Sequence, residues 1–516
     1  MSDTQGDILI GVDAGTSVIK AVAFDRAGRQ IEAASTPNRY TTRADGAVFQ
    51  SLDETWADCA ATLRDLGAKV DNLARRTAAV AVTGQGDGTW LVGKDDAPVT
   101  DAWLWLDARA AATVRRLRDR PSDRQRFEAT GTGLAACQQG AQIARMAEAT
   151  PEILDRAEAA LHCKDWLYLS LTGVRATDPS EGSWSYGNFR NRAYDDGVIE
   201  ALGLTARRAL LPPILDGTQT THPLTPKAAA STGLLAGTPV CLGFVDIACT
   251  ALGAGIYTGA PAACSIVGST GMHMRATATA DVRLGQERSG FTIVLPIPDV
   301  VAQVQSNMAA TLNIDWALRL AGDLMAEFGH DVTHAELVAR MEHWLAASRP
   351  GAILYHPYIS EAGERGPFVN GNARAGFIGL ASGHRFPELL RAVVEGLGMA
   401  ARDCYAAMGA LPTELRLTGG AARSRALRAV LAASVGASVR TSTREEAGAA
   451  GAAMIAAVAI GAYPTMNDCI AEWVTPLLSA PEPPDADLTQ TYQRLFPAYL
   501  LARRALEPVW DMMAQN

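Results

Sequence analysis

The sequence predicts an α/β fold built from two lobes of similar plan. The chain of 516 residues is too long for one ordinary hydrophobic core, so two or more domains are expected. Its first part alternates strand and helix patterns, and a strand, a turn rich in Gly and hydroxyl groups, and a second strand occur near the start and again after residue 261. Hydrophobic residues make up 48% of the chain and charged residues 20%, as in a folded globular protein.

The elements of the first lobe follow in order from residue 8. Strand patterns over residues 8–16 and 18–25 precede helical spacing over residues 52–66. Residues 77–93 then predict a strand, a turn and a strand. Residues 177–194 are polar and irregular, so we expect loops and a small subdomain there rather than core.

A second cycle of elements begins after residue 236. Residues 237–255 predict a strand, a loop and a helix, and residues 262–277 predict a strand, a turn and a strand. A long helix is expected over residues 386–409, a strand over residues 414–419 and a helix over residues 420–436. The two lobes are expected to meet near residues 241–260. The two lobes share the order of their motifs but not their residues. Chance similarity between Gly-Thr turns is therefore an alternative to an internal repeat.

Charge and composition exclude several classes of partner. The formal net charge is -9 and Lys and Arg form no cluster along the chain, which argues against nucleic acid and against an anionic membrane surface. Phosphate-bearing ligands would have to be held by backbone amides, hydroxyl groups and a metal ion.

Cysteine usage and the absence of targeting signals favour the cytoplasm. The eight cysteines are scattered without a CxxC motif, which indicates small buried residues in a reducing compartment. The polar N-terminus does not resemble a signal peptide. The most apolar tract, residues 448–463, is shorter than the roughly 20 residues of a membrane span, so we expect a buried helix and no membrane association.

The first turn, Asp13-Ala14-Gly15-Thr16-Ser17, has a composition that suits phosphate. Gly15 lets the backbone approach closely, and the amides and the hydroxyls of Thr16 and Ser17 donate hydrogen bonds. Asp13 could hold Mg²⁺ through water, because magnesium keeps several waters and takes other oxygens from its substrate. The alternative is an ordinary hairpin with Gly at a positive φ.

Two common nucleotide motifs are missing. A P-loop requires GxxxxGK[ST], but Lys94 is the only lysine that follows a glycine, and Asp95 comes after it. No strand leads into a clean GxGxxG with a helix behind it, so a Rossmann fingerprint is also unsupported.

Two further glycine-rich segments in the second half are candidate nucleotide contacts. The turn Gly268-Ser269-Thr270-Gly271 could bind another phosphate from the opposite lobe. Gly419 and Gly420 follow a strand and precede a helix, where flat backbone can pack against adenine or ribose. The alternative for this pair is a strand-to-helix connection that needs Gly for its geometry.

Two acidic residues are candidates for chemistry on an alcohol. Asp246 follows an apolar strand and precedes a small-residue helix at the expected junction, a suitable place for a base that accepts a hydroxyl proton; a simple helix cap is the alternative. Gln85 and Asp87 offer an amide and a carboxylate for a polyhydroxylated ligand, and a Gly-Asp-Gly hairpin turn is the alternative. Trp103 and Trp105 alternate like a half-buried strand, and we expect both in core packing.

Taken together and in this order, the motifs resemble the FGGY family of carbohydrate kinases, within the actin/hexokinase/Hsp70 superfamily of ATPases. The resemblance covers roughly residues 8–463, and its parts are residues 13–25, 46–56, 164–173, 243–255, 268–271, 379–397 and 418–432. It implies two ribonuclease-H-like (actin-like ATPase) lobes with an interlobe cleft. Residues 1–248 would then form the sugar- or polyol-binding lobe and residues 249–516 the nucleotide-binding lobe.

The resemblance also implies the cofactors ATP and Mg²⁺ and a role for each candidate. It assigns Asp13 to the metal, and Asp246 becomes the general base beside the substrate. The residues assigned to ATP are Gly15, Thr16, Ser17, Gly268, Ser269, Thr270, Gly419 and Gly420. The partner is a small polyol or sugar, and a homodimer is compatible with the family.

The acceptor turn departs from two branches of the family. Xylulokinases often carry Gln-Met-His-Gly where this chain has Gln85-Gly86-Asp87-Gly88, and glycerol kinases carry an Arg-Glu pair at residues 86 and 87. An acid with more room, left by Gly86, favours an acceptor longer than glycerol. Residues 83–110 and 359–368 look most like the erythritol kinases and next like the L-xylulose kinases of the family.

The resemblance therefore favours phosphorylation of a terminal hydroxyl of erythritol. L-xylulose, another pentulose or a pentitol is the alternative acceptor. A non-catalytic sugar-responsive regulator is the alternative of another class, although such a protein could lose the base, whereas this chain keeps Asp13, Asp246 and both phosphate turns.

Overall fold

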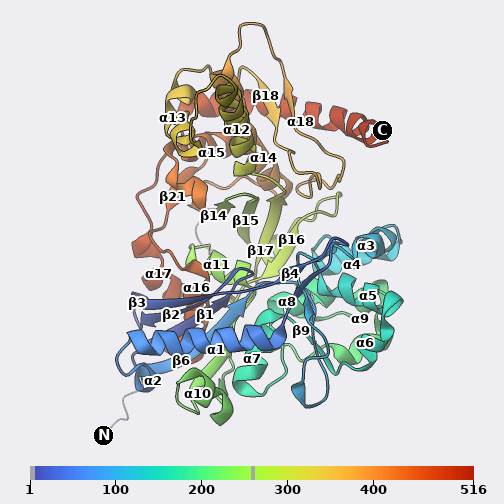
Figure 1. Ribbon diagram of the computed structural model, residues 1–516, viewed down its shortest axis with the longest axis vertical. Coiled ribbons are helices and arrows are strands. Elements are labelled where there is room, and N and C mark those ends of the chain that lie inside the picture. The colour runs from blue at the N-terminus through green and yellow to red at the C-terminus, as the bar shows by residue number, and fades with distance from the viewer. Residues whose placement is uncertain (1–5, 257–261, 516) are drawn as a thin grey trace.

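Two mixed sheets, one above the other in Figure 1, organise the molecule. The computed structural model describes residues 6–256 and 262–515, so the last part of the expected junction between the lobes, residues 257–260, lies outside the described residues. The sheet of the N-terminal lobe has the strand order β12 (His222–Pro223), β13 (Pro239–Leu242), β6 (Thr77–Gly84), β1 (Ile8–Ala14), β2 (Val18–Asp25), β3 (Gln30–Pro37). Strands β13, β6 and β1 run parallel, whereas β1, β2 and β3 form an antiparallel meander.

The sheet of the C-terminal lobe repeats this plan. Its order is β16 (Phe291–Val294), β17 (Val300–Asn307), β15 (Gly271–Ala278), β14 (Ala262–Val267), β20 (Glu414–Thr418), β21 (Ser438–Thr441). Here β14, β15 and β17 form the antiparallel meander, and β14, β20 and β21 run parallel. The echo noticed in the sequence is therefore a structural repeat, with β1 equivalent to β14 and β6 equivalent to β20.

Helices cover both sheets, and their apolar faces build the core. Helices α1 (Leu52–Lys69) and α7 (Cys163–Thr172) pack on one face of the first sheet. Helices α14 (Phe386–Ala407) and α15 (Arg425–Val435) pack in the C-terminal lobe. Helices α1, α14 and α15 each bury an apolar face, as the spacing of their hydrophobic residues requires, whereas α7 is buried along almost its whole length.

A central apolar cluster joins the two lobes. It contains α11 (Asp246–Gly253), which follows β13, and α16 (Ala447–Ala459), which follows β21 but packs against β1 and β6. Helix α16 is the buried helix expected in the apolar tract. In the described residues no helix is both long and apolar enough to cross a membrane.

Residues 177–194 differ from the expectation of loops outside the core. They contain α8 (Pro179–Tyr186), which is buried along its whole length. Its start is fixed because the side chain of Asp178, the N-cap, accepts hydrogen bonds from the backbone N–H groups of Ser180 and Glu181, and Pro179 occupies the first helical position. The prediction of irregular structure was wrong at this point.

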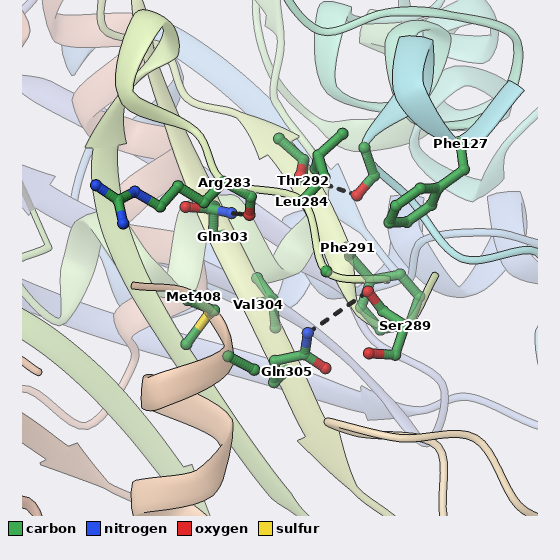
Figure 2. A pocket seen from close by; sticks show the side chains of 13 residues that line it. Phe127, Arg283, Leu284, Ser289, Phe291, Thr292, Gln303, Val304, Gln305 and Met408 are labelled. Carbon is green, nitrogen blue, oxygen red and sulfur yellow. Dashed lines mark hydrogen bonds between the residues drawn. The ribbon is translucent and has the colours of Figure 1, made fainter. Parts of the chain in front are cut away.

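The lobes also touch through strand β16, which packs against α8 and beside α4 (Ser122–Thr130). The hydroxyl of Thr292 donates to the carbonyl oxygen of Gly131 (2.9 Å), and the rings of Trp184 and Phe291 lie 5.3 Å apart. Figure 2 shows Phe127 of α4 facing the strands of the C-terminal lobe across a cavity of about 10 Å³. This cavity contains none of the predicted site residues and has the volume that one water needs.

Candidate functional site

Three parallel strands bring the acidic candidates to one edge of the first sheet. Asp13 is the penultimate residue of β1, the turn with Asp87 follows the end of β6, and Asp246 follows β13 as the first residue of α11. The carboxyl ends of parallel strands lie at the same edge of a sheet, which is where α/β folds bind ligands. Asp246 is not an N-cap, because the capping position belongs to Val245.

The carboxyl groups at this edge influence one another. Burial raises the pKa of Asp246 well above its ordinary value, and the charges of Asp13, Glu181 and Asp87 raise it further, although the backbone N–H of Ile247 lowers it. Burial likewise raises the pKa of Asp13 to about 6 and that of Asp87 to about 6. An aspartate with a raised pKa is a better proton acceptor than an ordinary one, as long as it is ionised.

Asp13 is enclosed by the start of α16. A Cβ atom built on Gly448 would lie 2.2 Å from the Asp13 carboxylate, so a side chain at residue 448 would displace it. Lys20, the register partner of Asp13 on β2, points its amine to Glu446 at 2.7 Å. Asp13 offers carboxylate oxygens, the ligand type that Mg²⁺ prefers, and burial raises its pKa, so a bound cation would stabilise its charged form.

A chain of four hydrogen bonds between side chains and backbone holds the first turn in place. Thr16 donates to Gln85 (3.1 Å), Gln85 donates to Gln50 (2.7 Å), Gln50 donates to Asn38, and Asn38 donates to the carbonyl oxygen of Gly15 (2.8 Å). Gly15 does not adopt a positive φ, so the alternative of a hairpin that needs glycine for that reason is wrong. Ser17 is exposed at the tip of the turn.

Trp105 belongs to this site and not to the core. Strand β8 (Ala102–Trp103) ends before Trp105, and Trp103 is buried as expected. Trp105 is 38% exposed, and its indole N–H donates to the hydroxyl of Thr16 at 2.8 Å. The expectation of core packing was therefore wrong for Trp105, because the alternating pattern continues past the end of the strand.

Asp87 lies in a turn with a left-handed backbone. Its φ is 58° and that of Gly88 is 74°, yet β6 does not pair with β7 (Trp90–Val92), which pairs with β9 (Ala159–Leu161) instead. The hairpin alternative for this turn is therefore wrong. Asp87 is 6% exposed, and its Oδ1 atom has no hydrogen-bond partner among the described residues.

Gly86 serves a different purpose from the one expected. A Cβ atom built on it would lie 2.5 Å from Val245 and 3.1 Å from the carboxylate of Glu181. The space of a side chain is already filled by these two neighbours, so Gly86 does not open room for a longer acceptor. It lets the segment before Asp246 and helix α8 approach the turn closely.

Glu181 is the residue that sequence reasoning missed. It is fully buried, it accepts a hydrogen bond from the backbone N–H of Asp87 (3.2 Å), and burial raises its pKa to about 7. The available signal was Asp178-Pro179-Ser180-Glu181, which has the order of an N-cap, a first-turn proline and an acidic first turn.

The candidates of the C-terminal lobe form a second group. The turn after β14 is exposed at Ser269 and Thr270, and its carbonyl groups accept hydrogen bonds from Ala310 N (2.7 Å) and Thr311 N (3.0 Å). Gly419 has a φ of 83°, and a Cβ atom there would lie 2.7 Å from the carbonyl oxygen of Val267. Residue 419 must therefore be glycine, because it has a positive φ and lies too close to the strand before the turn to carry a side chain.

Gly420 lies next to open space, because apart from its chain neighbours no described residue has a heavy atom within 4 Å of a Cβ built on it. Gly268 is open in the same way. Across residues 6–256 and 262–515, no hydrogen bond links this second group to the acidic edge of the first sheet.

The chain matches one family along most of its length. The model of the FGGY family of carbohydrate kinases matches with its N-terminal domain over residues 8–253 and with its C-terminal domain over residues 263–460. The chain belongs to this family, and the protein is a carbohydrate kinase that uses ATP.

Two individual kinases of the family are similar to the chain over nearly its whole length. The chain is 68% identical, over 99% of its length and 99% of the relative, to erythritol kinase of Brucella abortus (strain 2308). It is 26% identical to L-xylulose/3-keto-L-gulonate kinase of Escherichia coli (strain K12), with 95% of each chain covered.

Solved structures confirm the actin-like two-lobed fold. Xylulose kinase from Lactobacillus acidophilus superposes with a TM-score of 0.87 at 22% identity, covering 98% of this chain and 99% of that one. Xylulose kinase from Rhodospirillum rubrum also gives a TM-score of 0.87 at 22% identity, with coverages of 98% and 100%.

Proposed function

We propose that the protein transfers the terminal phosphate of ATP to a terminal hydroxyl of erythritol. The choice of erythritol as the acceptor rests on the 68% identity, over nearly the whole of both chains, to erythritol kinase of Brucella abortus. Asp87 supports it, because a buried carboxylate with an unpaired Oδ1 is suited to accept hydrogen bonds from hydroxyl groups.

In this proposal Asp246 is the general base. Its carboxylate takes the proton of the attacking hydroxyl as the oxygen bonds to phosphorus and the bond to the leaving ADP oxygen breaks. Its raised pKa suits this step, since proton transfer to a weakly acidic carboxyl group is more favourable. Gln85 and Asp87 bind the remaining hydroxyls of the acceptor, beside Gly86.

The phosphates are held between the two turns. Thr16 and Ser17, with the backbone of Gly15, donate from the first lobe, and Ser269 and Thr270, with Gly268, donate from the second. Gly419 and Gly420 lie against the nucleotide. Asp13 would hold Mg²⁺, and the ion would supply positive charge that neutralises the phosphates.

The N-terminal lobe thus binds the acceptor and the C-terminal lobe the nucleotide, in the cytoplasm, where ATP is available. All eight cysteines are free and seven of them are buried, which supports a reducing compartment. The homodimer stays a prediction.

The test is ADP release with Mg-ATP in a coupled assay across erythritol, L-xylulose, D-xylulose, ribitol, xylitol and glycerol. We expect the highest kcat/KM with erythritol. A pentulose or pentitol as the best acceptor would discard erythritol and keep the kinase. No ADP release with any of these acceptors would favour the sugar-responsive regulator.

A further inference from the structure

The first turn of helix α8 holds both parts of the proposed acceptor site. The carboxylate of Glu181 accepts a hydrogen bond from the backbone N–H of Asp87 (3.2 Å). The hydroxyl oxygen of Ser180 accepts one from the backbone N–H of Val245 (3.0 Å), the residue directly before Asp246. Adjacent residues of one helix therefore hold the turn with Asp87 and the segment with the proposed base.

This helix turn is itself fixed by buried charges. Asp178 accepts a hydrogen bond from the backbone N–H of Ser180 (2.7 Å) and pairs with the amine of Lys164 (2.7 Å). Lys164 also pairs with Asp165 (2.6 Å), and all of these side chains are fully buried. A buried pair of this kind allows little movement, because separating the charges inside the protein is costly.

Glu181 also connects the site to a buried histidine. Its Oε2 atom lies 3.4 Å from His162 Nε2, and His162 Nδ1 lies 2.9 Å from Asp165. Burial disfavours the charged imidazole, yet Glu181 and Asp165 raise the pKa of His162. Glu181 thus faces the His162 ring on one side and the Asp87 backbone on the other.

We propose that Ser180 and Glu181 are positioning residues that fix the separation between Asp87 and Asp246, and so set the length of polyol whose terminal hydroxyl reaches the base. The inference rests on the proposed roles of Asp87 and Asp246. A polyol bound by Asp87 at its inner hydroxyls presents its end to Asp246 only if the two groups are correctly spaced, and misplacement by about 1 Å costs roughly 100-fold in rate.

The first test is Ser180→Ala, which leaves the Val245 N–H without its acceptor. We expect kcat for the best acceptor to fall by roughly 10- to 100-fold and the preference for its chain length to weaken, while the KM for ATP stays unchanged. Ser183→Ala is the matched control. Ser183 is buried on the same helix, but within the described part of the chain its hydroxyl bonds only to the carbonyl oxygen of Pro179, so wild-type kinetics are expected.

Equal kinetics for Ser180→Ala and Ser183→Ala would overturn the proposal. The test uses whichever polyol the wild-type protein phosphorylates best. A wild-type preference for another acceptor would therefore contradict the erythritol assignment while the comparison of these two variants still decides the role of Ser180.

The second test, Glu181→Gln, also decides the matter if Ser180→Ala does not fold. Glutamine keeps an oxygen that can accept the hydrogen bond from the Asp87 N–H, whereas alanine removes it. We expect the acceptor KM to change little in Glu181→Gln and to rise by roughly tenfold in Glu181→Ala, with the KM for ATP unchanged in both. Equal acceptor KM values for the two variants would contradict the proposal.

Discussion

At the scale of single residues, Asp87 should decide how well the acceptor binds. Asp87→Ala removes the buried carboxylate, so we expect the acceptor KM to rise by roughly 10- to 100-fold with the KM for ATP unchanged. Asp95→Ala controls for the backbone, since Asp95 also has a positive φ (59°) but is exposed. Steady-state kinetics check this, and an unchanged acceptor KM in Asp87→Ala would count against its role.

The pH dependence of turnover should show the raised pKa of Asp246. A base must be ionised to accept a proton, so kcat/KM for the acceptor is full above the pKa and is lost as pH falls through it. Because burial, Asp13, Glu181 and Asp87 raise this pKa, the loss should begin well above the pH at which an ordinary aspartate titrates. The apparent pKa belongs to the coupled carboxyl groups together. A flat profile between about pH 5 and pH 8 would contradict the account.

Sequence reasoning located residues in turns better than residues in the helix behind them. Asp13, Asp87 and Asp246 could be singled out because each lies near the end of a recognisable strand or just after one. Glu181 could not, since its position depends on a hydrogen bond to a residue 94 positions away. Trp105 was assigned to the core because no local signal marks the end of strand β8.

At the scale of elements, helix α8 shows why a buried helix can escape prediction. Its residues are buried on every side, so it has no polar face and no amphipathic spacing that would mark it as a helix. Its Ser and Gly content resembles that of a loop. Only the capping residues at its start carry a helical signal. By contrast, α1, α14 and α15 were predicted because their apolar spacing is regular.

The packing of α16 on β1 gives a prediction for stability. A Cβ atom on Gly11 would lie 1.9 Å from the carbonyl oxygen of Ala449, so Gly11→Ala must separate strand and helix. We expect a loss of about 1–3 kcal/mol in the free energy of unfolding, seen as a lower Tm. Gly67→Ala, at an exposed position in α1, is the matched control and should raise the Tm slightly. A Tm for Gly11→Ala equal to or above wild type would refute the packing argument.

At the scale of the whole molecule, the order of motifs predicted the two lobes, and the repeated strand order confirms them. The contacts between lobes could not be predicted. Helix α16 comes late in the sequence yet packs on the first sheet, and Thr292 reaches Gly131 across 161 residues. The boundary at residue 248 stays a prediction, and that residue lies within α11.

The most direct test of the central claim compares wild-type protein with Asp246→Asn in phosphoryl transfer from Mg-ATP to erythritol, with the binding of both ligands measured separately. The account predicts wild-type turnover and a variant that binds ATP and erythritol nearly normally but is slower by roughly three orders of magnitude. Near wild-type turnover in Asp246→Asn would contradict the claim that the acid at the junction of the two lobes is the base.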